Sequence, residues 1–271
     1  MDRRHANARW RNVVGDHTRG HCGGSSYMPS IGRALILASS VLVAAHAAPA
    51  VRRWPVSLWF PRMTRVKADD AVALTFDDGP DQELEAFLKV LGEAKARATF
   101  FVLGEQVARN PSRLKEIIHC GHEIGVHGYR HRNHLFRTPA AIVEDMRRAK
   151  DVIEEAAERP TRFFRPPYGR FSLATWLEAD RQGWERVSWS RVGHDYDIRA
   201  TPSSVVANIG WPVAGDILLL HDSDRYGTPG SCRVTLEALP TILERLATLE
   251  LRTCLLGDLS TRAHPVNASA G

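Results

Sequence analysis

One short apolar run limits what this chain can fold into more than any other feature. Residues Ala71 to Phe76 (AVALTF) are almost entirely apolar or β-branched, and they end on Asp77, Asp78 and a Gly-Pro turn. An apolar run of this length without polar alternation is typical of a strand covered on both faces, as in a parallel sheet. Two adjacent carboxylates there repel each other unless a cation, a proton or hydrogen-bond donors compensate them. The stretch alone leaves two interpretations open, a solvated Asp-Gly-Pro turn and a functional site.

Strand-like and helix-like segments alternate from about residue 66 to residue 258. Apolar residues at 84, 87, 88 and 91 follow the spacing of one helix face, which predicts an amphipathic helix after the first strand. N-caps followed by proline are predicted at Thr138-Pro139 and Thr201-Pro202. Further strands are predicted at 98–103, 122–127, 162–165, 186–189, 217–220 and 251–255. About seven strands separated by helices predict parallel βα units, for which a barrel is the economical closed sheet.

Charge is unevenly distributed along the chain. Residues 1–67 hold ten Arg and one Lys against two Asp, a net +9, whereas the whole chain carries +5, so residues 68–271 carry −4. The basic segment 1–33 lacks apolar periodicity and is predicted to be disordered, and the tail 259–271 is predicted to be flexible. Because the acidic remainder gives no electrostatic reason for a polyanion partner, no nucleic acid is expected to bind.

An apolar stretch at 34–51 (ALILASSVLVAAHAAPAV) separates the basic segment from the rest. A secretory signal peptide, starting from Met1 or Met28, would end at a small-residue site near 45–47. A signal anchor would tether the chain to a membrane, although a helix of this length is slightly short for a bilayer core. The third interpretation is a helix packed on the domain. The favoured location is the cell envelope, with the protein either anchored or secreted.

Polar residues follow the predicted strands at the points where the strands end. They are Asp77 and Asp78 after the first strand, His127 after the third, Arg165 after the fourth, Asp195 after the fifth and His221 after the sixth. The C-terminal strand ends of a parallel α/β barrel all face the same side. These side chains are therefore expected to converge on one face of the domain.

His127 and His131 stand four residues apart, which places both imidazoles on one face if the segment turns helically. One carboxylate of the Asp doublet and two imidazoles would leave a divalent ion open positions for water and substrate, as in catalytic zinc sites. Zinc is the predicted metal, and cobalt, nickel and manganese tolerate the same ligands. A solvated or core-packed pair is the alternative, and His122, His134 and His194 remain further ligand candidates.

Two more loops carry chemistry at strand ends. In the RPPYG loop at 165–169, two prolines stiffen the backbone between a guanidinium and an aromatic ring. Arg165 is suited to hold a carboxylate, and a backbone N–H near Tyr168 is suited to face a developing oxyanion, unless the loop is simply a rigid turn. His221, near an acid such as Asp195, is suited to act as a general acid, with a satisfied surface histidine as the alternative.

Four motifs together resemble those of the polysaccharide deacetylases of carbohydrate esterase family 4, the NodB-homology domain. They are TFDDGP (75–80), HxxxH (127–131), RPPYG (165–169) and LLLHD (218–222), in the order of the family. The resemblance covers roughly residues 71–255. It implies a distorted (β/α)7 barrel over a catalytic domain at 66–258, and an enzyme that removes N- or O-linked acetyl groups from an acetylated glycan.

The resemblance also implies a role for each motif residue. The implied metal ligands are Asp78, His127 and His131. The implied catalytic residues are Asp77 as the base that activates water, Arg165 as the residue that orients it, His221 as the acid that protonates the leaving group, and Asp195 as the residue that tunes this acid. The implied substrate contacts are a backbone donor at Tyr168 and an acetyl pocket formed by Tyr196 and Leu219.

Three positions depart from the family pattern. Gly128 stands where Ser or Thr usually follows the first ligand histidine, and Val192 and Tyr196 replace an Asp and a Trp around Asp195. The favoured function is a metal-dependent deacetylase of a cell-envelope or extracellular polysaccharide or oligosaccharide. One alternative is a catalytically silent glycan-binding member, and another is an amidohydrolase acting on a small non-sugar amide, for which the altered pocket at Tyr196 leaves room.

Overall fold

The computed structural model describes residues 30–51 and 55–259. The chain divides into two compact units, residues 1–41 and 42–271. Helix α1 (Ser30–Ala47) contains most of the predicted apolar stretch and ends within the second unit. In this described part of the chain, no helix is both long and apolar enough to cross a membrane. The segments predicted to be disordered or flexible, 1–33 and 259–271, lie almost wholly outside the described residues.

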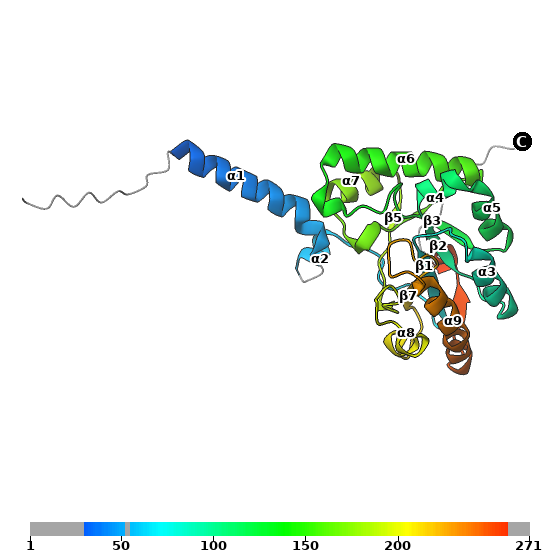
Figure 1. Ribbon diagram of the computed structural model, residues 1–271. Helices are drawn as coiled ribbons and strands as arrows, with labels where there is room; N and C mark the ends of the chain where they lie inside the picture. Colours follow the sequence, from blue (N-terminus) through cyan, green and yellow to red (C-terminus); the bar gives the residue numbers. More distant parts are fainter. Residues whose placement is uncertain (1–29, 52–54, 260–271) are drawn as a thin grey trace, which may run out of the picture. The chain divides into compact units, whose positions relative to one another are not determined.

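A sheet of parallel strands forms the centre of the second unit, with helices around it (Figure 1). The strand order is β5-β4-β3-β2-β1-β7-β6, and β8 pairs with the start of β1. The strands are β1 (Ala71–Asp77), β2 (Thr99–Val102), β3 (Glu123–Val126), β4 (Phe163–Phe164), β5 (Glu185–Arg186), β6 (Arg191–Val192), β7 (Ile217–His221) and β8 (Arg252–Cys254). The apolar run 71–76 is thus an interior strand between β2 and β7, buried along its whole length as its apolar character predicted.

One extended stretch at 185–192 links the two ends of the sheet. Its first residues form β5 against β4, and its last residues form β6 against β7. Between them, the Ser188 amide donates to the Met63 carbonyl at 2.7 Å, and the Met63 amide donates to the Arg186 carbonyl at 2.8 Å. The single strand predicted at 186–189 is therefore wrong, because Met63 takes over the pairing in its middle. The described residues form eight strands in one curled, parallel (β/α) sheet. The bridge between Met63 and Val187 distorts this sheet where β5 and β6 separate.

The strands separate an outer apolar core from a smaller inner one. On β1, Val72 and Leu74 pack in the larger cluster with the helices, whereas Ala73 belongs to the inner cluster. Because side chains alternate along a strand, Thr75 and Asp77 lie on the same side as Ala73. The other buried residues of the inner cluster are Phe101, Phe163, Val187, Ile217 and Leu256. The Asp77 carboxylate is therefore directed to the inside of the barrel at its C-terminal end.

The described helices of the second unit include the amphipathic helix predicted after the first strand and the two helices with predicted N-caps. Their bounds are α2 (Val56–Trp59), α3 (Leu84–Glu93), α4 (Gly104–Arg109), α5 (Pro111–His119), α6 (Pro139–Ala157), α7 (Leu173–Arg181), α8 (Pro202–Ile209), α9 (Ser231–Thr248) and α10 (Leu256–Leu259). The Thr138 hydroxyl accepts from the Ala141 amide, and the Thr201 hydroxyl accepts from the Ser204 amide. Both predicted N-caps are confirmed, since each satisfies an amide that has no partner within the helix.

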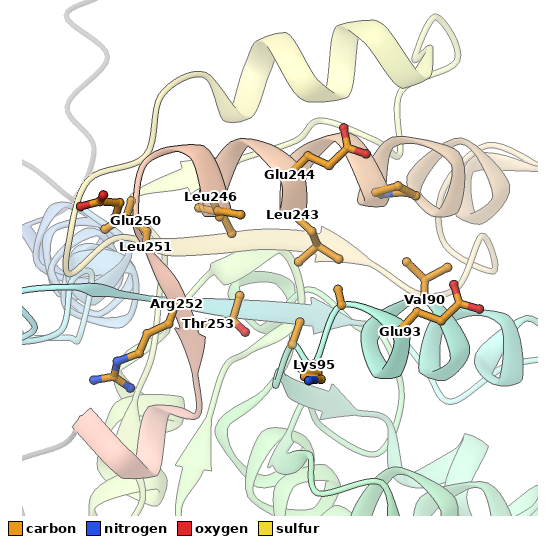
Figure 2. A pocket seen from close by; sticks show the side chains of 14 residues that line it. Val90, Glu93, Lys95, Leu243, Glu244, Leu246, Glu250, Leu251, Arg252 and Thr253 are labelled. Atoms are coloured by element: carbon orange, nitrogen blue, oxygen red, sulfur yellow. The ribbon is translucent and has the colours of Figure 1, made fainter.

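A groove of about 680 Å³ lies between α3 and α9, where Figure 2 shows its lining side chains. Val90, Leu243 and Leu246 contribute apolar surface, while Lys95 lies in the turn between α3 and β2, and Thr253 lies in β8. The groove is thus at the N-terminal end of the sheet, opposite the strand ends that carry the predicted site. None of the site residues predicted from the sequence lines it.

Candidate active site

Arg165 and Asp77 form a buried ion pair inside the barrel. The Nη1 atom of Arg165 donates to Asp77 Oδ1 at 2.6 Å and to the Thr75 hydroxyl at 2.9 Å. Its Nη2 atom donates to the Ser188 carbonyl at 2.9 Å, and the guanidinium carbon lies 4.1 Å from the centroid of the Phe101 ring. Arg165 is fully buried, so these contacts leave it one position. The guanidinium therefore fixes one Asp77 oxygen and leaves Oδ2 directed toward the neighbouring histidine, His127 Nε2 being 3.8 Å away.

Asp78 faces away from this pair and toward both histidines of the HxxxH motif. Its backbone has a φ of +81°, a left-handed conformation that separates its side chain from that of Asp77. Asp78 Oδ1 lies 3.3 Å from the Nε2 atoms of both His127 and His131. Each of these three residues offers one ligand atom, and the three atoms lie within 4.8 Å of one another. In the described part of the chain, they form the group that could hold a metal ion.

The protonation of these groups suits a cation. The Nδ1 atom of His127 lies 2.7 Å from the Arg165 carbonyl, which can only accept, so Nδ1 carries a proton and Nε2 is the nitrogen left for a cation. His127 Nε2 faces Asp78 Oδ1, a buried atom without a hydrogen-bond donor. Burial lowers the pKa of His131 to about 4, which favours its neutral ring. Acceptors that converge without a donor fit a divalent cation.

Asp195 and His221 form a second buried pair beside the first. His221 Nδ1 lies 2.8 Å from Asp195 Oδ1, and the His221 amide donates to Oδ2 at 2.7 Å. The Thr235 hydroxyl donates to the same Oδ2. Burial alone would lower the pKa of His221, but the Asp195 carboxylate, with Asp78 and Asp77 further away, raises it to about 10. His221 is therefore held as a protonated imidazole at the end of β7, next to Asp77 in the paired register.

The three predicted substrate contacts lie around these pairs. Tyr168 has a φ of +58°, and its exposed ring lies 4.4 Å from the ring of His131. Tyr196 is also exposed and meets the ring of His221 edge-on at 5.3 Å. Leu219 is buried and lies two residues before His221 on the same side of β7. The two tyrosines thus flank the metal group on one side and the His221 pair on the other.

The other candidate histidines lie outside this cluster. His122 accepts a hydrogen bond from the Ala98 amide at the start of β2, and His134 is buried against the Thr175 hydroxyl. His194 is exposed and lies 3.0 Å from the Tyr196 hydroxyl through its Nδ1. None of the three belongs to the group of possible metal ligands among the described residues.

Comparison with known proteins identifies the family of this chain. Residues 64–187 match the family model described as polysaccharide deacetylase. A peptidoglycan-N-acetylglucosamine deacetylase of Bacillus cereus is 33% identical over 202 residues, which cover 71% of this chain and 89% of that relative. The chain belongs to the polysaccharide deacetylase family.

Solved structures of family members have the same fold. A peptidoglycan N-acetylglucosamine deacetylase in complex with 4-naphthalen-1-yl-N-oxidanyl-benzamide superposes with a TM-score of 0.71 at 27% identity, over 78% of this chain and 99% of that one. A pseudoenzyme of carbohydrate esterase family 4 from Bacillus anthracis gives a TM-score of 0.65 at 25% identity, over 72% of this chain and 67% of that one. The curled parallel sheet is therefore the (β/α)7 barrel of the polysaccharide deacetylases.

The polysaccharide deacetylase motif HxxxH is held here by a loop, not by a helical turn. Gly128 has a φ of +94°, which prevents the helical turn considered for 127–131, yet the two rings still lie 5.5 Å apart. Asp145 on α6 holds the loop, since its carboxylate accepts from the Tyr129 amide at 2.8 Å and the Arg130 amide at 3.2 Å. This carboxylate fixes the backbone at the point where the family usually has a hydroxyl.

Sequence reasoning about the polysaccharide deacetylase motifs missed several residues of the site. Neither Asp145 nor Tyr226 lies in a sequence pattern that indicates a role. Asp145 stands on a polar helix face, and Tyr226 lies in a glycine-rich loop. Asp222 ends the LLLHD motif but received no role. It is buried, accepts from the Gly79 amide at 3.1 Å, and has a pKa raised by burial well above the usual range. It thus ties the loop after β7 to the turn that follows Asp78.

Proposed function

We propose that this chain is a metal-dependent hydrolase that removes acetyl groups, N- or O-linked, from a glycan. The observation that carries the proposal is the convergence of three separate arrangements at one end of the barrel. They are the possible metal group, the Asp77–Arg165 pair and the Asp195–His221 pair. A turn with solvated acids would need none of these, and the Asp77 and Asp78 side chains are almost fully buried.

The metal would be held by Asp78, His127 and His131. A bound divalent cation supplies a lowered pKa for its water and polarises an acetyl carbonyl. The donor set of one carboxylate and two imidazoles suits zinc, and cobalt, nickel and manganese tolerate it. The proton that His127 donates to the Arg165 carbonyl orients this ligand, as the second hydrogen bond of a metal-bound histidine usually does.

Asp77 is the proposed base. One of its oxygens is taken by Arg165, and the other is free to accept the proton of the attacking water. Arg165 orients this carboxylate and is the cation paired with it, since a buried charge without a partner would be strongly destabilised. The geometry supports this division of roles, because Asp77 is bound to a guanidinium whereas Asp78 Oδ1 has no donor.

His221 is the proposed acid that protonates the leaving amine or alcohol. Asp195 accepts from its Nδ1, so the Nε2 proton is the one available to the substrate. A backbone N–H near Tyr168 would donate to the developing oxyanion, and Tyr196 and Leu219 would contact the acetyl group. Tyr196 stands edge-on to His221, which is where a group leaving toward His221 would pass.

The substrate and location are proposed from the relatives and the N-terminal sequence. The named relatives act on peptidoglycan, which favours an acetylated glycan of the cell envelope as the substrate. The apolar stretch 34–51, preceded by a basic segment, favours export by a signal-type sequence. The protein would then act in the envelope or outside the cell.

A catalytically silent member is the second candidate, because the family includes a pseudoenzyme with this fold. Tyr196 and Val192 are the observations that favour it, since both depart from the family pattern around Asp195. The proposed metal group, base and acid are nevertheless all present, so the hydrolase is preferred.

Acetate release decides between these candidates. The full chain, loaded with zinc, is incubated with acetylated chito-oligosaccharide, peptidoglycan, acetylated xylan and a small N-acetyl amide, with and without chelator. Acetate that appears from a glycan and disappears with chelator supports the hydrolase. Acetate from the small amide alone would favour an amidohydrolase, and no acetate from any substrate would favour the silent member.

A further inference from the structure

Tyr226 covers His131, one of the three proposed metal ligands. Its ring is stacked on the His131 imidazole, with 4.4 Å between the centroids and 23° between the planes. The tyrosine belongs to the loop 222–230, between β7 and α9. Tyr168 meets the same imidazole at a tilt, also at 4.4 Å, so His131 contacts two phenol rings.

The two histidines of the HxxxH motif are oriented in different ways. His127 donates through Nδ1 to the Arg165 carbonyl. In contrast, His131 Nδ1 is a buried atom with no hydrogen-bond partner. A metal-bound histidine usually has its second nitrogen hydrogen-bonded, which fixes the ring and strengthens it as a ligand. For His131, ring stacking takes the place of that hydrogen bond.

Glu105 fixes Tyr226 in its stacked position. The Tyr226 hydroxyl donates to Glu105 Oε1 at 2.5 Å, the length of a charge-assisted bond. Glu105 is the second residue of α4, and the first two amides of this helix donate to the carbonyls of Gly128 and Tyr129 in the loop between the two histidines. The same short helix therefore holds the backbone of the ligand loop and the ring that covers it.

The loop that carries Tyr226 is itself fastened to the barrel. Arg225 donates to both oxygens of Asp81, at 3.2 and 2.9 Å, and the Ser223 hydroxyl donates to Asp81 at 2.7 Å. Asp81 follows the TFDDGP turn, so the loop after β7 is tied to the loop after β1. Tyr226 is thus held from both sides, by Asp81 through its neighbours and by Glu105 through its hydroxyl.

We propose that Glu105 and Tyr226 are positioning residues for the metal ligand His131, the glutamate acting through the tyrosine ring. An imidazole that binds a cation becomes electron-poor and is attracted to the face of an electron-rich ring. The strong hydrogen bond to Glu105 makes the phenol ring more electron-rich. The pair should therefore favour the metal-bound orientation of His131. This inference rests on the proposed role of His131 as a ligand.

Metal affinity tests the inference without any substrate. The full chain and its Tyr226→Leu, Tyr226→Phe and Glu105→Gln variants are titrated with Zn²⁺ against a chromophoric chelator. Their Co²⁺ complexes are compared by visible absorption. Tyr226→Leu should weaken Zn²⁺ binding about tenfold or more, the usual effect of removing a residue that orients a ligand. Tyr226→Phe and Glu105→Gln should weaken it less, because they keep the stacked ring. Both Tyr226 variants should also alter the Co²⁺ bands.

A control separates positioning from general loss of structure. Tyr196→Leu removes an exposed tyrosine that touches His221 but no proposed ligand, so it should leave Zn²⁺ affinity unchanged. Wild-type affinity and Co²⁺ bands in a folded Tyr226→Leu chain would overturn the inference. If Tyr226→Leu does not fold, the other two variants decide, since wild-type affinity in both overturns it and weaker binding supports it. Should His131→Ala bind Zn²⁺ like the wild type, the proposed ligand set itself fails.

Discussion

Arg165 donates to the Asp77 carboxylate at 2.6 Å, and both side chains are almost completely enclosed by the barrel. Arg165→Lys should leave metal content unchanged and lower kcat/KM by about 100-fold, because an ammonium cannot reproduce the fork that bonds Asp77, Thr75 and Ser188 together. Metal analysis and acetate release measure the two effects. Arg165→Lys with wild-type kcat/KM would show that Asp77 needs no fixed orientation.

The same pair should matter for stability. Arg165→Met leaves a buried carboxylate without its cation and should reduce the free energy of unfolding by about 3 kcal/mol in urea. Arg252→Met provides the matched control, since its ion pair with Asp70 is more than half exposed on both sides. That control should change the free energy of unfolding far less, because water already solvates both charges. Equal effects of the two substitutions would contradict the importance of the buried pair.

Asp195→Asn should move the loss of activity at high pH to lower pH. The proposed acid works only when His221 is protonated, so the rate falls as pH rises through its pKa. Asp195 is the principal group that raises this pKa, to about 10 in the metal-free chain, and a bound cation would lower it in both proteins. The basic limb of kcat/KM should shift down by about one pH unit or more.

Thr235→Val is the control for this shift, because it removes only the hydroxyl that donates to Asp195 and keeps the charge. Its basic limb should lie close to that of the wild type. An Asp195→Asn profile that coincides with the wild-type profile would remove His221 as the titrating acid.

His122 should make the protein sensitive to acid. Burial lowers its pKa to about 4 from an ordinary value of 6.5, and its Nδ1 accepts from the Ala98 amide, so protonation is unfavourable in the folded state. A group with a depressed folded pKa contributes stability above its unfolded pKa, and this stability is lost as pH falls from 6.5 to 4. The contribution of His122 is about 3 kcal/mol over that window.

His122→Asn keeps an acceptor for the Ala98 amide and cannot be protonated. Its free energy of unfolding should therefore fall less than that of the wild type between pH 6.5 and pH 4, when each is compared with its own value at pH 8. If the free energy of unfolding fell equally with pH in the two proteins, His122 would not be a source of the acid sensitivity. His131 and His134 also have lowered pKa values, so some acid sensitivity should remain in the variant.

Gly128→Ala should weaken metal binding through the ligand loop. The new Cβ would lie 3.1 Å from Asp145 Oδ2, and the backbone has a φ of +94°. Gly121→Ala is matched for backbone strain, with a φ of +80° and no atom within 4 Å of the new Cβ. Both should lose about 1 kcal/mol of stability, and only Gly128→Ala should lose Zn²⁺ affinity. Unchanged affinity in Gly128→Ala would show that the loop tolerates displacement.

Strands whose burial depends on their own sequence were predictable. The apolar runs of β1 and β7 and the caps at Thr138 and Thr201 are local features, and each lies where its residues predicted. The stretch 185–192 was not predictable, because its division into two strands depends on Met63, more than a hundred residues away in the chain. Pairing that depends on a distant backbone leaves no pattern in the paired segment itself.

The same distinction applies to the site. Arg165 and Asp77 could be brought together by reasoning, since both follow strands whose ends must meet. The orientation of His131 could not, because it depends on Tyr226, which comes from a loop with no periodicity. The HxxxH spacing indicated two histidines that do lie together, but it suggested a helical turn that Gly128 and Asp145 replace with a loop.

The division of labour between the two adjacent aspartates is the central claim, and one paired measurement tests it most directly. Zinc content and acetate release from acetylated chito-oligosaccharide are measured for Asp77→Asn and Asp78→Asn. Asp77→Asn should keep near wild-type zinc and release no acetate, whereas Asp78→Asn should lose both. Loss of zinc from Asp77→Asn, or acetate release by it at the wild-type rate, would contradict the account.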